Sequence, residues 1–541
     1  MAMPRPRRAG QTPPRRDEDD DAITSETTPL LAASSSPIVP GAVPEESKPL
    51  LSSTSSASTT GQPTPSAPST SDTKPLPKTQ ILLLCYARLI EPVAFFSIFP
   101  YINQMVQENG NLAEEDMGFY SGLIESLFSL TQMLVMVLWG KAADRIGRKP
   151  ILVFSLLGVA IATALFGFAK TIWQMILFRC AAGVFAGSIV TIRTMISEHS
   201  TRQTQATAFA WFAVAGNLGI LIGPLVGGAL ADPVHQYPGV FKNVHFLKTF
   251  PYALSSTVIA VIGLTAVVTS ALFLEETLVR QKPSSSSNGI DDGNEEGEGA
   301  TPRLHPHSTW DLLKAPGVGI VLYNYGHVML LAFAYTAVVP VFWATSIDLG
   351  GLGFSPLQIS LFMALTGLSQ AIWLLIFFPP LQHRLGTNGI MRICGAAYPF
   401  FLGSMPILNA VLRLHTQPGN TAFWVLAPIF LSLGPGVSMA FTGAQLALND
   451  VSPSHETLGM LNALALTLTS GLRSFSPALF SSLFAIGAGS QFLGGYLIWI
   501  ILVLLALGFT VSTRFLPETG EKGSEDGEDI GDGESDTSVR S

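Results

Sequence analysis

The stretch WGKAADRIGRKP, Trp139 to Pro150, packs five charged residues between two apolar runs. The run before it contains SLFSLTQMLVMVLWG, and the run after it is PILVFSLLGVAIATALFGFA. An apolar run of about 20 residues is long enough, as a helix, to cross the hydrocarbon core of a bilayer. Backbone polar groups in lipid must find partners within their own segment, so both runs are expected to be helices. The sequence therefore predicts that this stretch is a short loop between two membrane-spanning helices.

The same alternation extends over most of the chain. Charged residues make up only 13% of the 541 residues, whereas soluble domains carry about 25%. Twelve apolar segments are expected at residues 79–103, 117–139, 150–169, 171–194, 205–231, 249–274, 316–345, 355–379, 387–411, 421–446, 457–486 and 491–513. FLEET (Phe273 to Thr277) closes the sixth segment and FLPET (Phe515 to Thr519) closes the twelfth, which suggests related halves. We therefore predict an all-α membrane protein with twelve transmembrane helices in two six-helix bundles, a known transporter plan.

The domain organisation follows from composition and charge. We expect a disordered cytoplasmic tail, an N-terminal bundle, a cytoplasmic linker, a C-terminal bundle and a disordered acidic tail, at 1–77, 78–275, 276–315, 316–515 and 516–541. The first tail is rich in Ser, Thr and Pro, a composition that cannot bury a core. The opening stretch carries four cations against one acid, and short cationic loops face the cytoplasm. Both tails and the linker should therefore be cytoplasmic too.

Positive charge explains the side of the membrane, but it explains neither the glycines nor the acid. Gly140 and Gly147 permit a close approach or an unusual turn. Asp144 follows the second segment by about one turn. It can pair with nearby arginines, or meet the positive N-terminus of a helix from the other half. In the second arrangement Asp144 is a latch that forms when the cytoplasmic side closes. The alternative is a topology anchor with incidental glycines, and the residues alone leave both open.

Three motifs resemble signatures of the major facilitator superfamily and occur in that family's order. The opening stretch resembles G-x-x-x-D-R-x-G-R-K/R through Gly140, Asp144, Arg145, Gly147, Arg148 and Lys149. The fourth segment has an arginine followed by glycines at Arg179, Gly183 and Gly187. The fifth segment is similar to the antiporter pattern G-x-x-x-G-P-x-x-G-G through Gly219, Gly223, Pro224, Gly227 and Gly228. The resemblance spans about residues 79–515 and implies two bundles that rock around a central site.

Within the superfamily the chain resembles the drug:proton antiporter-1 group, especially the zinc-induced-facilitator-like proteins of fungi and plants. The forms WG-x-x-x-D-x-x-GRKP and GGLGFSPLQ (Gly350 to Gln358) carry this likeness. Two features depart from the plant members. Their cysteine motif in the first segment is absent, with only Cys85 nearby, and Ala210 stands where their antiporter signature begins with Ser. LQHRLGTNG in the second half is a degenerate copy of the opening stretch without its acid, so the latch should be stronger in the first half.

Ionisable residues inside the predicted segments are candidates for proton and substrate binding, because a charge in lipid is costly. Glu91 should lie about 18 Å into the first segment, and Glu125 about 12 Å into the second segment from the opposite face. Both fall near the midplane, where facilitator substrates bind. One of these acids is expected to gain and lose a proton. The alternative is a permanent ion pair between Glu91 and Arg88, which share a helix face.

Other polar residues have several readings. His327, three residues after Asn324, is a proton carrier, a substrate donor or a satisfied core residue. The resemblance implies that Arg179 modulates the pKa of a nearby acid. Arg473 should face either the central cavity or the latch, and a second group near the end of segment four is expected to belong to the latch, namely Arg193, Glu198 and Arg202. The fifth-segment glycines should allow a close helix crossing, with a bend at Pro224.

The expected function is a proton-coupled antiporter of a small organic molecule that works by alternating access, in efflux or vacuolar loading. A zinc-related transporter and a non-transporting sensor with the same fold are the alternatives. The HxH of His305 and His307 favours zinc, but no midplane His/Asp cluster accompanies it. We expect no enzyme activity, no cofactor and no resident metal, since no catalytic motif is present.

The expected partners are the small-molecule substrate, protons and the lipid bilayer, without nucleic acid, for a protein that acts as a monomer. ETTPLL and EESKPLL resemble acidic-dileucine sorting motifs that adaptors would read, through Leu30, Leu31, Leu50 and Leu51. They favour a vacuolar or endosomal membrane, with the plasma membrane as the alternative.

Overall fold

The computed structural model describes residues 76–278, 313–452 and 455–517, and every regular element in these ranges is a helix. The four sorting leucines, His305 and His307 lie outside the described residues, as do most of the two tails and the linker.

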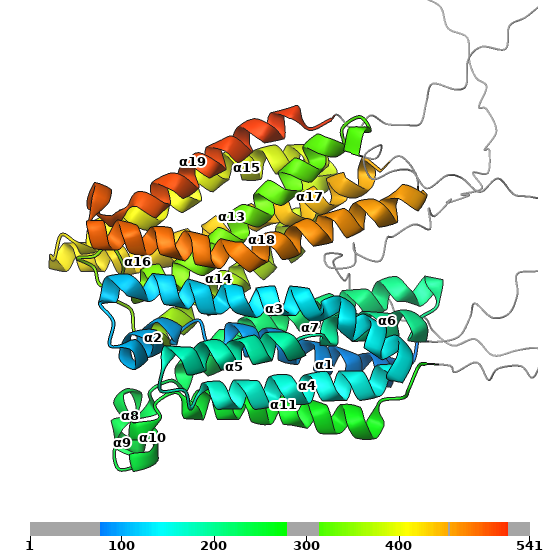
Figure 1. The fold of residues 1–541 in the computed structure, drawn as a ribbon. Helices are drawn as coiled ribbons and strands as arrows, with labels where there is room; N and C mark the ends of the chain where they lie inside the picture. The colour runs from blue at the N-terminus through cyan, green and yellow to red at the C-terminus, as the bar shows by residue number, and fades with distance from the viewer. Residues whose placement is uncertain (1–75, 279–312, 453–454, 518–541) are drawn as a thin grey trace, which may run out of the picture.

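The helices form two bundles that lie side by side (Figure 1). The N-terminal half contains α1 (Lys78–Phe96), α2 (Ile102–Gly110), α3 (Met117–Ile146), α4 (Arg148–Phe166), α5 (Ile172–Phe185), α6 (Ser188–His199), α7 (Arg202–Ala229) and α11 (Ala253–Phe273). Three short helices join α7 to α11: α8 (Pro233–Gln236), α9 (Pro238–Phe241) and α10 (His245–Thr249). The C-terminal half contains α13 (Val318–Ala344), α14 (Pro356–Ile372), α15 (Phe378–Leu412), α16 (Gln417–Leu433), α17 (Met439–Asp450), α18 (His455–Ser490) and α19 (Leu497–Ser512).

Short irregular helices interrupt or join these elements. They are η2 (Glu114–Asp116), the π-helix η3 (Trp373–Phe377), η4 (Gly434–Ser438), η5 (Phe492–Gly495) and η6 (Thr513–Phe515). Two predicted crossings are therefore built from two helices each: α5 with α6, and α16 with α17.

Ten helical stretches of the described residues are long and apolar enough to cross a membrane. One of them, Pro356–Leu412, is 57 residues long and contains a kink at Gly386, where φ is 67°. It therefore holds the eighth and the ninth predicted segments. The eleventh predicted segment corresponds to α18, whose 36 residues span about 54 Å at 1.5 Å per residue. The helices thus account for all twelve predicted crossings.

The prediction of a loop at the opening stretch needs a correction. α3 continues to Ile146 and α4 begins at Arg148, so only Gly147 separates the two helices. Polar headgroups and water solvate charged side chains beyond the hydrocarbon core, so the helix does not have to end where the apolar run ends. Gly147 ends it, because its φ of 133° and ψ of 151° lie in a region that is open essentially only to glycine. We call residues 140–149 the motif segment, its side of the molecule the motif face, and the other side the opposite face.

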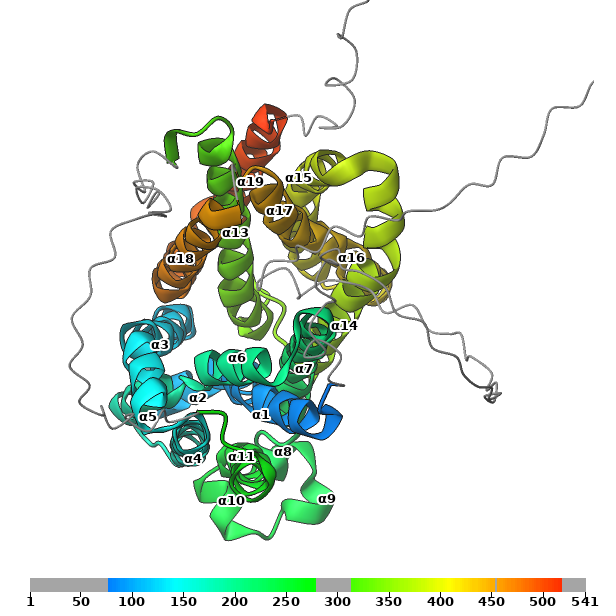
Figure 2. The same cartoon turned by 90° about the vertical axis from the view of Figure 1, so that its right-hand side faces the viewer.

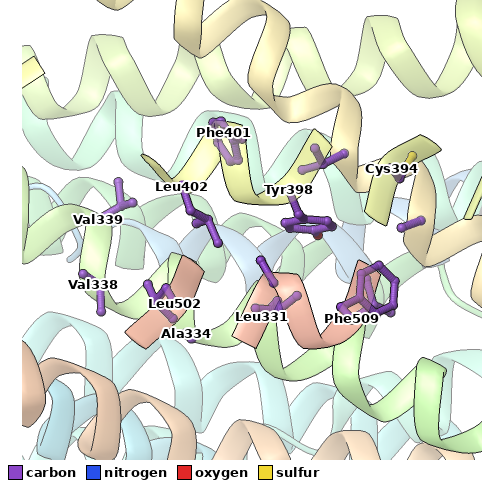
Figure 3. Close-up of a cluster of buried hydrophobic side chains, with 14 of the residues drawn as sticks. Leu331, Ala334, Val338, Val339, Cys394, Tyr398, Phe401, Leu402, Leu502 and Phe509 are labelled. Atoms are coloured by element: carbon purple, nitrogen blue, oxygen red, sulfur yellow. The ribbon is translucent and has the colours of Figure 1, made fainter. Parts of the chain in front are cut away.

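Each half has an apolar core of its own. In the C-terminal half, side chains of α13, α15 and α19 pack together, and Figure 3 shows Tyr398 and Leu402 on α15 facing Leu331 on α13 and Phe509 on α19. In the N-terminal half two clusters stack along α1, one around Ile98 and one of smaller size towards the motif face. Lipid replaces water around both bundles, so van der Waals packing rather than water exclusion holds the helices together.

The two halves meet along two helix pairs, α3 with α18 and α7 with α14, and both views show these pairs flanking the interface (Figures 1 and 2). The closest approaches lie between mid-depth and the opposite face. The Ser126 hydroxyl accepts a hydrogen bond from the Ala478 amide at 2.8 Å, and Glu114 accepts one from the Ser346 amide. Along α3 the buried residues run from Met117 to Gln132, and only Ala143 is buried nearer the motif face. The halves are therefore packed together mainly on the opposite face.

Candidate functional site

The charges of the motif segment form an ion-pair chain within the N-terminal half. The Arg148 guanidinium binds the Asp144 carboxylate one turn earlier and the Glu198 carboxylate of α6 at 3.0 Å. Arg148 is 10% exposed and Asp144 is 65% exposed at the side chain. Asp144 thus adopts the first of the two arrangements that its sequence allowed, pairing with a nearby arginine. Glu198, one of the three residues expected near the latch, belongs to this ion-pair chain. Arg193 does not, since it lies over the Phe212 ring, 5.4 Å from its centroid. The Arg202 side chain lies outside the described part of the structure.

The FLEET sequence at the end of the sixth segment completes this network. The Glu276 carboxylate accepts hydrogen bonds from the backbone amides of Arg148 at 2.9 Å and Lys149 at 3.1 Å, at the N-terminus of α4. A carboxylate is favoured there because it meets unpaired N–H groups and the positive end of the helix dipole. Partial burial alone would raise the pKa of Glu276, but its hydrogen bonds to backbone amides lower it overall.

The two motif glycines have different environments. The backbone angles of Gly147 require glycine, and a Cβ there would lie 2.6 Å from the Glu276 carboxylate and displace it. A Cβ at Gly140 would have only Val190 as a neighbour, at an ordinary 3.7 Å. The remaining motif residues, Lys141, Arg145 and Lys149, form no ion pair among the described residues.

Glu91 is buried at the point where the fourth crossing breaks. α5 ends at Phe185, and the Ala186 carbonyl accepts a hydrogen bond from Gln132 at 2.8 Å. The same Gln132 amide donates to Glu91 Oε1 at 2.6 Å, and the Ser188 hydroxyl at the start of α6 donates to Glu91 Oε2 at 2.8 Å. Neutral donors therefore satisfy both carboxylate oxygens of a side chain that is 7% exposed.

The alternative of a permanent Arg88–Glu91 ion pair is not formed in the described part of the chain. The Arg88 guanidinium lies over the Phe212 ring, 5.0 Å from its centroid, on α7. The Arg193 guanidinium lies over the same ring, 5.4 Å from its centroid. A cation over an aromatic face is stabilised by the ring quadrupole, so Phe212 holds two arginines on one side of Glu91.

Glu125 lies between cations from both halves. Arg179, on α5 of its own half, donates to the Phe95 carbonyl at 3.0 Å and stacks on the Phe128 ring at 4.4 Å. Arg473, on α18 of the other half, lies over the Phe95 ring, 4.6 Å from its centroid. Glu125 is buried on α3, three residues before Phe128, so its carboxyl lies close to this cluster. Arg473 therefore faces the middle of the interface rather than the motif face, which decides between its two predicted positions.

Asn324 and His327 point into the C-terminal bundle. Asn324 accepts a hydrogen bond from Ser512 at 2.8 Å, and His327 Nε2 pairs with the Leu505 carbonyl at 2.9 Å. Both partners belong to α19. His327 Nδ1 is buried without a hydrogen-bond partner among the described residues, so only one ring nitrogen is satisfied and the three readings of His327 stay open.

The glycines of α7 pack against α1 and against the other half. A Cβ at Gly219, Gly223 or Gly227 would meet backbone carbonyls of α1 or the residue after it, at 2.7, 2.9 and 1.9 Å. A Cβ at Gly228 would meet Ser360 and the Pro356 carbonyl of α14. Gly183 and Gly187 allow similarly close packing of the fourth crossing on α3, where Gly187 faces the Trp139 ring. Gly228 therefore sets the distance between the halves, and the other glycines set distances between helices within the N-terminal half.

A cavity of about 180 Å³ lies at the interface, mostly within the C-terminal half. α13, α14, α15, η4 and α17 form its walls, and Phe96 and Ile220 close it from the N-terminal half. Sequence reasoning missed this cavity, because its lining residues are ordinary apolar and aromatic side chains of membrane helices. It also missed Gln132, Ser188 and Glu276, whose partners are far away in sequence. Among the described residues, no group of three His, Cys, Asp or Glu side chains could hold a metal ion.

The comparisons with known proteins agree with this architecture. The sequence matches the Major Facilitator Superfamily over residues 84–477. The chain belongs to this superfamily, and it is a multi-pass membrane transporter.

The chain is 46% identical over 446 residues to the efflux pump azaK of Aspergillus niger, covering 82% of this chain and 89% of that protein. It is 30% identical over 401 residues to ZINC INDUCED FACILITATOR 1 of Arabidopsis thaliana, covering 71% and 79%. These relatives confirm the resemblance predicted from the motifs. The crystal structure of a D-xylose–proton symporter has the same fold, with a TM-score of 0.59 at 14% identity over 82% of this chain and 99% of that one. The predicted fold class is confirmed.

Proposed function

We propose that this transporter exports a small organic molecule in exchange for protons, with Glu125 as the proton-binding group. One observation carries this assignment: Glu125 is buried on α3 one turn before Phe128, and Arg179 from its own half and Arg473 from the other half meet over the Phe95 ring that packs against Phe128. When the halves rock, Arg179 keeps its place beside Glu125, whereas Arg473 moves with α18. The proton affinity of a buried carboxyl rises when a neighbouring cation withdraws, so rocking and protonation are coupled.

Glu91 has a different role in this proposal. Both of its hydrogen-bond donors belong to the N-terminal half. These hydrogen bonds travel with Glu91 when the halves move, so both carboxylate oxygens keep their partners. Glu91 then holds α1, α3 and α6 together at the break between α5 and α6. Substrate export fits the 46% identity to an efflux pump.

The test uses purified protein in proteoliposomes, with a substrate found by comparing the metabolites of deletion and overexpression strains. Glu125→Gln should abolish transport driven by a pH gradient and keep exchange of labelled for unlabelled substrate, because exchange needs no net proton movement. Glu275→Gln, an exposed carboxyl at the end of the sixth crossing, is the matched control and should behave like the unchanged protein. Gradient-driven transport that survives in Glu125→Gln would refute this assignment.

We also propose that the latch forms between Asp144 and the other half when the motif face closes. The packing of the two halves on the opposite face supports a state in which the motif face, on the cytoplasmic side, is open. An exposed Asp144 is what the latch hypothesis expects of that state.

A further inference from the structure

The interface cavity has a lining without charged side chains. Its walls carry phenyl, indole and aliphatic groups together with hydroxyls and one amide, Gln370. The charged residues of the interface, including Glu91, Glu125 and Arg473, are absent from this lining. A charged ligand here would lose its hydration without gaining an ion pair, which is strongly unfavourable in a low-dielectric site.

Three polar atoms on lining residues are buried without a hydrogen-bond partner in the part of the chain that the structure describes. They are the Trp343 Nε1, the Tyr335 hydroxyl and the Ser438 hydroxyl. The Trp343 side chain is almost completely buried, with 1% exposed. A nearby tryptophan shows the ordinary arrangement, since Trp373 Nε1 donates to the Ser432 carbonyl at 2.9 Å. A buried donor without a partner costs about 1–3 kcal/mol, so three of them around one cavity indicate a place for a ligand.

These three atoms define what the ligand must offer. The indole N–H can only donate, whereas hydroxyls donate and accept. The atom of the ligand beside Trp343 must therefore be an acceptor, such as a carbonyl oxygen. The Tyr335 and Phe401 rings lie 5.0 Å apart at the wall, and they present aromatic surface to the same space.

The size of the cavity limits the part of the ligand that it holds. Its volume of about 180 Å³ slightly exceeds the roughly 150 Å³ of an apolar cavity that takes up benzene. One ring or two fused rings therefore fit, and the rest of a larger molecule has to extend along the interface.

We propose that the cavity walled by Tyr335, Trp343 and Ser438 binds an uncharged aromatic ring system that carries carbonyl oxygens as hydrogen-bond acceptors. This proposal rests on the proposed export function, and it names the class of molecule that is exported. The charged cluster around Glu125 then serves proton movement and does not recognise the ring system.

The test measures binding rather than transport, so it does not depend on proton coupling. Full-length protein in nanodiscs is dialysed against three probes of similar outline: coumarin with a lactone carbonyl, naphthalene without oxygen, and the anion coumarin-3-carboxylate. Empty nanodiscs give the background for partition into lipid. Tyr335→Phe removes one hydroxyl from the cavity, and Tyr323→Phe on the same helix is the control, because Tyr323 is exposed on the outside of the bundle and is absent from the lining.

We expect coumarin to bind more tightly than naphthalene, and the carboxylate to bind most weakly. Tyr335→Phe should raise the Kd for coumarin about threefold to tenfold, the range of one net hydrogen bond. It should leave naphthalene binding and the control variant unchanged. The melting temperature of the ligand-free Tyr335→Phe protein should stay the same or rise, since the lost hydroxyl has no hydrogen-bond partner among the described residues.

Two results would overturn the proposal: tighter binding of the carboxylate than of coumarin, or an unchanged coumarin Kd in Tyr335→Phe. Either result leaves proton-driven export intact, which the Glu125→Gln experiment tests separately. Conversely, selective coumarin binding by a protein that moves its substrate without protons would sustain this inference and refute the proposed coupling.

Discussion

A double-mutant cycle between Gly147 and Glu276 tests whether these residues act as one unit. An alanine at Gly147 would occupy backbone angles that cost about 1–3 kcal/mol for a residue with a side chain. Its Cβ would also lie 2.6 Å from the Glu276 carboxylate and displace it from the N-terminus of α4. The lost contact between carboxylate and helix terminus is worth about 0.3–1 kcal/mol at a largely exposed site. Gly147→Ala should therefore destabilise the N-terminal half by about 2–3 kcal/mol.

The assay is thermal unfolding followed with a thiol-reactive dye, since Cys85 and Cys394 are free and buried. For a unit of about 200 residues, each kcal/mol lowers the melting temperature by about 2–4 °C. Gly147→Ala should lower it by about 5–10 °C, whereas Glu276→Gln should lower it by a few degrees at most. The double variant should be more stable than the sum of the two changes, because Gly147→Ala already removes the contact that Glu276→Gln weakens.

The control and the pH dependence sharpen this test. Gly140→Ala, in a helix where the new Cβ would make only an ordinary contact with Val190 at 3.7 Å, should be neutral or slightly stabilising, because alanine favours the helix. The pKa of Glu276 is lowered in the folded protein, so its contribution is present above the unfolded value of about 4.3 and is lost as the pH falls through the lowered pKa. The difference between the unchanged protein and Glu276→Gln should therefore shrink in acid. Equal costs at the two glycines, or strict additivity in the cycle, would refute the reasoning.

Three further predictions concern gating, packing and sorting. Asp144→Asn should reduce flux strongly while changing stability by less than about 1 kcal/mol, as expected for an exposed ion pair; unchanged flux in proteoliposomes would exclude the latch. Gly227→Ala, whose Cβ would lie 1.9 Å from the Ser97 carbonyl oxygen, should cost about 1–3 kcal/mol by forcing α1 and α7 apart, whereas Gly403→Ala, with open space around it, should not; equal melting temperatures would contradict this. Alanines at the dileucine positions should move a fluorescent fusion from vacuolar or endosomal membranes to the plasma membrane, and an unchanged distribution would dismiss the motifs, at Leu30, Leu31, Leu50 and Leu51.

The sequence predicted the crossings well because their signal is local. The length of an apolar run matches the thickness of the hydrocarbon core. Gly, Pro and charged residues mark the ends of the run. The prediction failed where a helix continues beyond the hydrocarbon core. α3 extends to Ile146 through charged residues, since a helix in the headgroup region loses nothing by carrying them.

The sequence suggested individual candidate residues for the site, but it did not suggest which of them contact one another. Arg88 and Glu91 share a helix face, which suggested an ion pair. In the structure, Gln132 and Ser188 donate hydrogen bonds to Glu91, and Arg88 lies over an aromatic ring. Such contacts join residues 41 to 97 positions apart, and a single sequence carries no signal for them. For the same reason, the sequence could not show that polar atoms of Tyr335, Trp343 and Ser438 are buried beside one cavity.

The two halves repeat the geometry of the motif segment without repeating its chemistry. Gly386 corresponds to Gly147 in the degenerate copy, and both have positive φ, 67° and 133°. In the N-terminal half the end of the sixth crossing holds α4 through the Glu276 carboxylate. In the described part of the C-terminal half, the end of the twelfth crossing is joined to α15 by the Asn388 amide, which donates to the Pro517 carbonyl at 2.6 Å; Glu518, which matches Glu276 in sequence, lies outside the described residues. Because the Glu276 carboxylate titrates and its interaction with the helix terminus is screened by salt, acid and salt should loosen the motif segment of the N-terminal half. This half is also the one that carries Asp144, Glu91 and Glu125.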